Sequence, residues 1–73
     1  MLPDNRVNSF HEGQVWESPR GTLYKVMFTR NSQTTLRAGD DGTGKITRRP
    51  WDAVVNWILM FDPLYPDRNQ AEI

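Results

Sequence analysis

Residues 13–29 constrain the fold of this chain more than any other segment, because they resemble two β-strands around a tight turn. Ser18-Pro19-Arg20-Gly21 matches a type I turn, since proline presets the backbone at the second position and glycine is favoured at the fourth. The flanking residues are mostly β-branched or aromatic, which is typical of hairpin strands. The segment therefore predicts a small antiparallel β-domain rather than a helical bundle.

The residues that follow extend this hairpin into a predicted meander of four strands. Turn-forming residues at 30–32 and a glycine-rich loop at 39–44 separate further strand-like runs. We expect strands at about 14–18, 22–29, 33–38 and 45–49. Alternation along the second strand places Tyr24, Val26 and Phe28 on its core-facing side.

The pattern changes at Pro50, where helical spacing replaces alternation. Apolar residues recur at i, i+3, i+4, i+7 and i+8: Trp51, Val54, Val55, Ile58 and Leu59. Pro50 suits a first helical position, and Asp52 suits the positive end of a helix dipole. We predict a helix over residues 50–61. The same residues are also strand formers, which leaves a β interpretation of residues 54–61 open.

These elements predict an α+β, β-rich fold: a twisted four-stranded antiparallel meander with one C-terminal helix. We expect a single domain at residues 13–62, a flexible leader at 1–12 that docks through Val7 or Phe10, and a flexible tail at 63–73. The predicted core is Val15, Tyr24, Val26, Phe28, Leu36, Ile46, Trp51, Val54, Val55 and Ile58. A chain of 73 residues buries only about 60% of its unfolded surface, which leaves little room for an enclosed active site.

Composition excludes several classes of function. Nine basic and nine acidic residues cancel, which argues against binding nucleic acid through bulk charge. The chain has no cysteine, so neither disulfides nor thiolate metal sites are available. No apolar run approaches the roughly 20 residues of a membrane span, and the first residues do not resemble a signal peptide. We expect a cytoplasmic protein with no membrane partner.

Motifs for catalysis or cofactor binding fail on their spacing. Residues 39–45 match the glycines and lysine of a phosphate-binding loop, but Ile46 stands where a magnesium-binding Ser or Thr is needed. Asp40 and Asp41 lack the further carboxylate that a calcium loop requires. His11 is the only histidine and lies in the predicted leader, where we expect it to be solvated. We therefore predict no enzyme activity, no metal and no cofactor.

Aromatic residues with neighbouring arginines predict a protein-binding surface instead. Val15 and Trp16 alternate, so Trp16 points outward if Val15 faces the core, and a one-residue slip would reverse this assignment. Exposed Trp beside Arg is typical of interaction hot spots. The predicted protein-binding residues are Trp16, Arg20, Tyr24 and Trp57.

Two alternatives stay open beside this interpretation. The first is a weak nucleic-acid-binding module, since arginine and aromatic side chains on a sheet can contact phosphates and stack on bases. Its predicted residues are Lys25, Arg37, Lys45, Arg48 and Arg49. The second is a small structural protein that forms a homo-oligomer through an edge containing Trp57 and Met60.

A resemblance to known proteins covers residues 13–37. Gly13, Trp16, Gly21, Tyr24 and Val26 form a pattern that resembles the opening of small SH3-like β-barrels. The same pattern is similar to short uncharacterised proteins carried by prophages of enteric bacteria. The resemblance implies an SH3-like partial barrel and a mobile-element origin, and it carries over no catalytic or binding residue. The predicted helix at 50–61 is longer than the single turn usual in such barrels.

Overall fold

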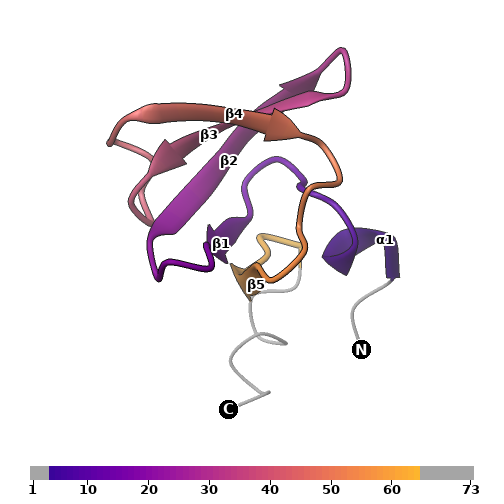
Figure 1. Cartoon of the computed structure of the whole chain (residues 1–73), viewed down its shortest axis with the longest axis horizontal. Coiled ribbons are helices and arrows are strands. Elements are labelled where there is room, and N and C mark those ends of the chain that lie inside the picture. Colours follow the sequence, from indigo (N-terminus) through magenta and orange to yellow (C-terminus); the bar gives the residue numbers. More distant parts are fainter. Residues whose placement is uncertain (1–3, 65–73) are drawn as a thin grey trace.

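The computed structural model describes residues 4–64 as one short helix and five strands. These elements are α1 (Asp4–Val7), β1 (Val15–Glu17), β2 (Leu23–Arg30), β3 (Gln33–Ala38), β4 (Ile46–Pro50) and β5 (Ile58–Phe61). The strands form a single antiparallel sheet in the order β4-β3-β2-β1-β5 (Figure 1). The predicted β-rich fold and its four-stranded meander are confirmed, and β5 adds a fifth strand beside β1.

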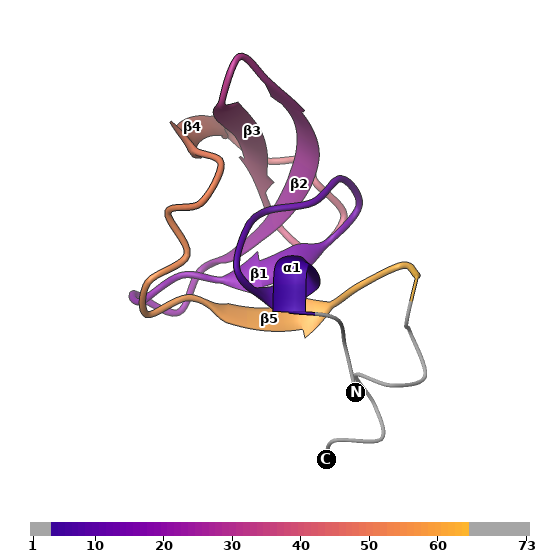
Figure 2. The same ribbon diagram turned by 90° about the vertical axis from the view of Figure 1, so that its right-hand side faces the viewer.

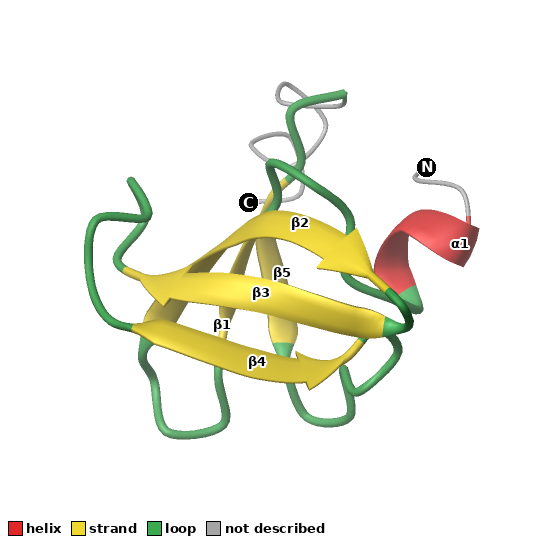
Figure 3. Cartoon of the chain, turned by 90° about the horizontal axis from the view of Figure 1, so that it is seen from above, coloured by secondary structure: helices red, strands yellow, loops and turns green. Residues whose placement is uncertain are grey.

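The sheet bends over on itself rather than lying flat. β1 and β5 cross beneath the layer formed by β3, β4 and the end of β2 (Figures 2 and 3). The β2–β3 register shifts between Val26 and Phe28, and the β1–β5 register shifts between Val15 and Trp16. Because an extra residue in one strand increases its bend and twist, these two irregularities help to curve the sheet around its core.

The predicted turns form as the sequence indicates. The Gly21 amide donates to the Ser18 carbonyl at 2.8 Å, which closes the turn between β1 and β2. Asn31 and Ser32 both have positive φ, at 54° and 65°, in the two-residue connection between β2 and β3. Positive φ at both central residues is typical of a type I′ turn, whose twist matches that of the flanking strands.

The core lies inside this bend. Phe10, Trp16, Val26 and Leu36 form its buried centre, against which Tyr24, Ala53, Val54, Trp57 and Leu59 are partly buried. Phe10 packs edge-on against Trp16, with the ring centroids 5.4 Å apart. Of the two leader residues expected to dock, Phe10 is therefore buried, whereas Val7 remains 39% exposed.

Half of the predicted core residues are exposed instead. These are Phe28, Ile46, Trp51, Val55 and Ile58. Phe28 pairs with Thr35 while Val26 pairs with Leu36, so the shift between them turns Phe28 to the opposite face of the sheet from Val26. Ile46 pairs with Arg37, one position out of phase with the inward-facing Leu36.

The predicted helix at residues 50–61 is wrong. Residues 51–57 form successive turns, and residues 58–61 form β5, which is closer to the β interpretation left open for this segment. Asn56 has a φ of 67°, a left-handed conformation that interrupts any helix. Pairing with β1, far away in sequence, gives the backbone of Ile58–Phe61 partners that a local apolar pattern cannot reveal.

The predicted outward position of Trp16 is also wrong. Val15 and Trp16 are both buried, at 7% and 2% exposed. β1 lies between β2 and β5, and the burial of both residues shows that it is covered on both faces, so alternation along it separates two buried sides. Trp16 therefore cannot serve as an exposed anchor for a partner.

Candidate functional site

A fully buried glutamine connects the N-terminal segment, β1 and the residue after β5. The Gln14 side-chain oxygen accepts hydrogen bonds from the His11 amide at 2.8 Å and from the Trp16 indole Nε1 at 2.7 Å. Its nitrogen donates to the Arg6 carbonyl and to Asp62 Oδ2, both at 2.8 Å. All four hydrogen-bonding positions of this amide are therefore used. We call Arg6, Gln14, Trp16 and Asp62 the Gln14 cluster.

Asp62 holds the charged part of this cluster. Its carboxylate is 0% exposed and receives both Arg6 Nε, at 2.9 Å, and Arg6 Nη2, at 2.6 Å, in a bidentate pair. The Leu64 amide donates to the same carboxylate at 2.9 Å. Burial alone would raise the pKa of Asp62, but the hydrogen bonds from Arg6, Gln14 and Leu64 outweigh it and hold the pKa below the ordinary value of 3.8.

This cluster stabilises the fold and offers nothing to a substrate. Every oxygen of the Asp62 carboxylate accepts two hydrogen bonds from the protein itself. A general base needs a lone pair that can reach a substrate proton, and this carboxylate has none to spare. The cluster could not be predicted from the sequence, because its members are up to 56 positions apart and no local pattern links them.

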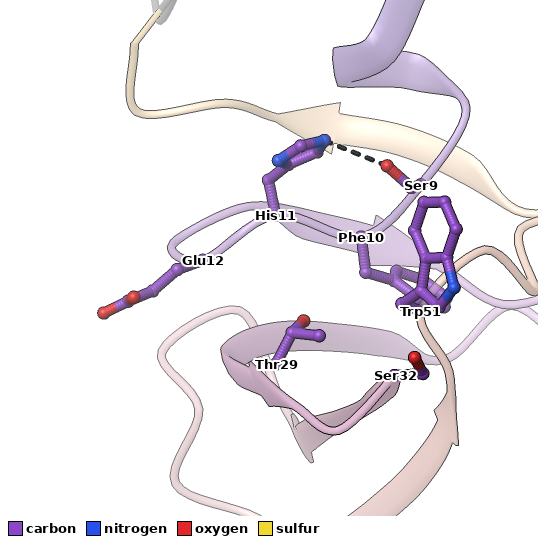
Figure 4. Close-up of a pocket in the computed structure, with 7 residues that line it drawn as sticks. All are labelled: Ser9, Phe10, His11, Glu12, Thr29, Ser32 and Trp51. Atoms are coloured by element: carbon purple, nitrogen blue, oxygen red, sulfur yellow. Dashed lines mark hydrogen bonds between the residues drawn. The ribbon is translucent and has the colours of Figure 1, made fainter.

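A second polar group lines a hollow beside the N-terminal segment. Ser9, Phe10, His11, Glu12, Thr29, Ser32 and Trp51 surround it (Figure 4). Ser9 Oγ and His11 Nε2 share a hydrogen bond of 2.9 Å, which resembles the contact between a nucleophile and its general base. However, Ser9 is only 4% exposed, and Glu12 points away from the imidazole in Figure 4. The hollow therefore lacks an accessible nucleophile, and Glu12 does not orient the imidazole.

Another hollow gathers four of the residues that the sequence singled out. Arg20, Tyr24, Arg49 and Trp57 line it, together with Ser18, Pro19, Thr47 and Val55. Its walls come from the β1–β2 turn, the inner face of β4 and the turn before β5. Its volume is about 350 Å³, similar to the smaller ligand pockets of proteins. We call it the aromatic–arginine pocket.

Trp57 organises this pocket. Its ring lies 5.3 Å from Phe10 in the core and 5.6 Å from Tyr24, measured between centroids. The Arg49 guanidinium carbon lies over the Trp57 ring, 5.2 Å from its centroid, in a cation–π contact. One edge of Trp57 is therefore anchored in the core while Arg49 covers another part of it.

Neither arginine of the pocket forms an ion pair with a carboxylate in the described part of the chain. Between residues 4 and 64, Arg6–Asp62 is the only arginine–carboxylate ion pair. No described residue accepts a hydrogen bond from the Arg20 or Arg49 side chain, and Arg49 Nε is buried without an acceptor. The pocket therefore holds a cation that no described carboxylate neutralises.

The other predicted basic residues do not join this pocket. Arg37 Nε donates to the Gly44 carbonyl at 2.9 Å and so braces the loop after β3. Lys25 on β2 lies opposite Arg37 in the β2–β3 register, and Lys45 is exposed just before β4. Arg48 lines a separate surface with Phe28, Arg30, Asn31, Gln33 and Thr35, which we call the outer patch. Its neighbour Arg49 faces the pocket, so β4 carries the two arginines on opposite faces.

The glycine-rich loop contains a local turn. Asp41 Oδ1 accepts hydrogen bonds from the Thr43 hydroxyl at 2.9 Å and the Thr43 amide at 3.2 Å. These bonds from Thr43 lower the pKa of Asp41. The contacts are those of an aspartate that stabilises a turn.

Residues 4–64 contain no group of three or more acidic or histidine side chains positioned to hold a metal ion. In the same residues, no helix has the length and apolar character needed to cross a membrane. Comparisons with protein-family models, with curated proteins and with solved structures found no match to this chain.

Proposed function

We propose that this chain is a small, non-enzymatic accessory or regulatory protein that binds another protein through the aromatic–arginine pocket. The proposal includes the SH3-like partial barrel, the mobile-element origin and the cytoplasmic location that the sequence suggested. The strand order β4-β3-β2-β1-β5 and the bend of the sheet support the barrel. The lack of cysteine suits a reducing compartment.

One observation carries the proposal: Arg20, Tyr24, Arg49 and Trp57 line a single concave surface. Tryptophan, tyrosine and arginine are the residue types enriched at the energetic centres of protein interfaces. Trp57 is fixed by the core on one side and by Arg49 on another, so binding would cost little side-chain entropy. The anchor of the proposed surface is thus Trp57 in place of the buried Trp16.

Charge reversal and steric blocking at the rim of the pocket test this proposal. Arg20 is exposed and Val55 is 78% exposed, so Arg20→Glu and Val55→Glu leave the core intact. We expect either variant to lose the partners that the unaltered chain captures from its native cells. Arg48→Glu is the matched control, because it introduces the same charge on the opposite face of β4. Unchanged capture by both pocket variants would contradict the proposal.

A weak nucleic-acid-binding module is the second candidate, and the outer patch favours it. Phe28 is 43% exposed, and the Arg30 guanidinium carbon lies 5.6 Å from the Phe28 ring centroid. Arg48 lines the same surface. An exposed ring beside two cations can stack on a base while the cations contact phosphates.

Titration with single-stranded oligonucleotides separates the two candidates. Nucleic-acid binding through the outer patch predicts an affinity that falls steeply with salt and is lost in Arg48→Ala. Arg49→Ala, on the pocket side, serves as the control and should bind normally. If no backbone resonance of the outer patch moves at low salt, this candidate is excluded.

A further inference from the structure

Resting on the proposed function, the geometry points to an acidic partner segment: we infer that the aromatic–arginine pocket receives the carboxylate of an Asp or Glu side chain in an extended peptide. The bound peptide would also present an apolar residue next to that carboxylate. The inference depends on how Arg49 is held and on the chemistry of the surrounding walls.

Arg49 is prepared to bind a planar anion. Cation–π contact with Trp57, at 5.2 Å, holds the guanidinium over the ring, so less freedom is lost when a ligand arrives than for an unrestrained side chain. None of the described residues accepts a hydrogen bond from it, and its Nε is shielded from solvent, so the two Nη groups are the donors available to a ligand. A carboxylate matches the planar guanidinium fork with two parallel hydrogen bonds.

The rest of the pocket suits a peptide that carries such a carboxylate. Arg20 supplies a second cation at the rim, and Ser18 and Thr47 supply hydroxyls. Val55, Pro19 and the exposed part of Trp57 supply apolar surface for a neighbouring side chain. No aspartate or glutamate lines the hollow, so nothing in its walls would repel an acidic segment.

A carboxylate fits this pocket better than a phosphodiester chain. The protein has nine basic and nine acidic residues, so its bulk charge provides no long-range attraction for a polyanion. Arg48 lies on the other face of β4 from Arg49, so the two arginines cannot contact the same ligand. A single carboxylate needs only the local pair of Arg49 and Arg20.

Nuclear magnetic resonance titration with two matched peptides tests the inference. The probes are acetyl-Pro-Leu-Glu-Leu-Pro-amide and the same peptide with Gln in place of Glu. We expect the acidic peptide to shift the Arg49 Nε–H and Trp57 indole N–H signals, and to bind about tenfold or more tightly than the Gln peptide. Arg49→Gln should remove this difference, whereas Arg48→Gln should preserve it.

Each other outcome overturns the inference in a recognisable way. Equal binding of both peptides would show that the pocket takes peptides without regard to charge, and the proposed function would survive. Shifts produced by inorganic phosphate or by an oligothymidylate, and larger than those of the acidic peptide, would show phosphate recognition instead. If neither peptide moves the two signals at millimolar concentration, the pocket does not recognise an acidic segment. The proposed function itself fails only if the Arg20→Glu and Val55→Glu variants capture partners normally.

Discussion

Gln14 forms a buried hydrogen-bond network that the local sequence pattern does not predict. It stands between Gly13 and Val15 in a run that resembles a strand entry, and its polar side chain suggests exposure. In the structure it is 0% exposed, and its amide forms four hydrogen bonds to four different residues. Only the tertiary arrangement supplies those partners, so this position could not be predicted from local sequence.

We expect Gln14→Leu to destabilise the protein by about 3 kcal/mol, because it leaves the Trp16 indole and part of the Asp62 carboxylate buried without partners. Urea unfolding followed by tryptophan fluorescence would measure the change. Gln33→Leu, at an exposed glutamine, is the control and should change the unfolding free energy by no more than about 0.5 kcal/mol. A loss below about 1 kcal/mol for Gln14→Leu would contradict this account.

Gly13 is constrained by a close neighbour as well as by its backbone. Gly13 and Gly21 have similar positive φ values of 89° and 85°, so alanine is strained at either position. A Cβ at Gly13 would lie 2.8 Å from Pro63 Cγ, whereas at Gly21 the nearest atom is 3.7 Å away. We expect Gly13→Ala to cost at least about 1 kcal/mol more than Gly21→Ala in thermal or urea unfolding. Equal costs would mean that Pro63 moves aside freely.

At the scale of elements, the sequence predicts the meander well and the last strand poorly. The turns at 18–21 and 30–32 depend on local chemistry, namely proline, glycine and asparagine at positions that suit them. Residues 50–61 have helical spacing but strand-forming residue types, and pairing of β5 with β1 decides between the two. Because β1 is distant in sequence, its influence on this segment is invisible in a local pattern.

The same non-local pairing explains why the candidate site could be predicted only in part. Arg20, Tyr24 and Trp57 were singled out by residue type and do line one pocket. Arg49 was grouped with Arg48 as part of one basic set, although alternation along the strand places these neighbours on opposite faces, as the structure shows. Trp16 was misplaced because an interior strand covered on both faces has no exposed side for alternation to identify.

The Arg6–Asp62 pair joins the segment of α1 to the end of β5 and should make stability depend on pH. The pKa of folded Asp62 is lowered, so its contribution is fully present above the ordinary value of 3.8 and is lost as the pH falls through the lower folded value. We expect urea unfolding between about pH 6 and about pH 2 to show this loss in the acidic part of the range.

Asp62→Asn tests the same contact at constant pH. Removing one partner of a buried ion pair leaves the arginine uncompensated, and we expect a cost of about 3–5 kcal/mol at neutral pH. The variant should also lose the part of the acid sensitivity that Asp62 contributes. Asp52→Asn, at an exposed aspartate, is the matched control. If both variants show the same acid profile as the unaltered chain, Asp62 is not its source.

At the scale of the whole molecule, the sheet has two outer strands of very different character. β4 carries Arg48, Arg49 and Pro50, which are typical of edges that resist pairing with other chains. β5 consists of Ile58, Leu59, Met60 and Phe61, with no charge or proline. Self-association through Trp57 and Met60, the remaining alternative from the sequence, would act at the β5 edge.

We expect Met60→Lys to slow aggregation on heating, because a lysine on an edge strand opposes pairing with a second chain. Light scattering at constant protein concentration would measure the rate of aggregation. Sedimentation would show whether the substitution dissociates an oligomer. Ile46→Lys is the control, since Ile46 on β4 is 51% exposed and Met60 is 46% exposed. Equal effects of the two substitutions would indicate that added charge, rather than the β5 edge, is responsible.

The contact between Arg6 and Asp62 suggests that the protein would tolerate circular permutation. These residues are 56 positions apart, yet their side chains share two hydrogen bonds. A short linker could therefore join the two ends of the described chain, and the exposed Asp40–Asp41 step between β3 and β4 could become the new pair of termini. Such a circular permutant would keep every strand neighbour of the present sheet. A cyclic form, with the linker but without new termini, would have a lower entropy in the unfolded state.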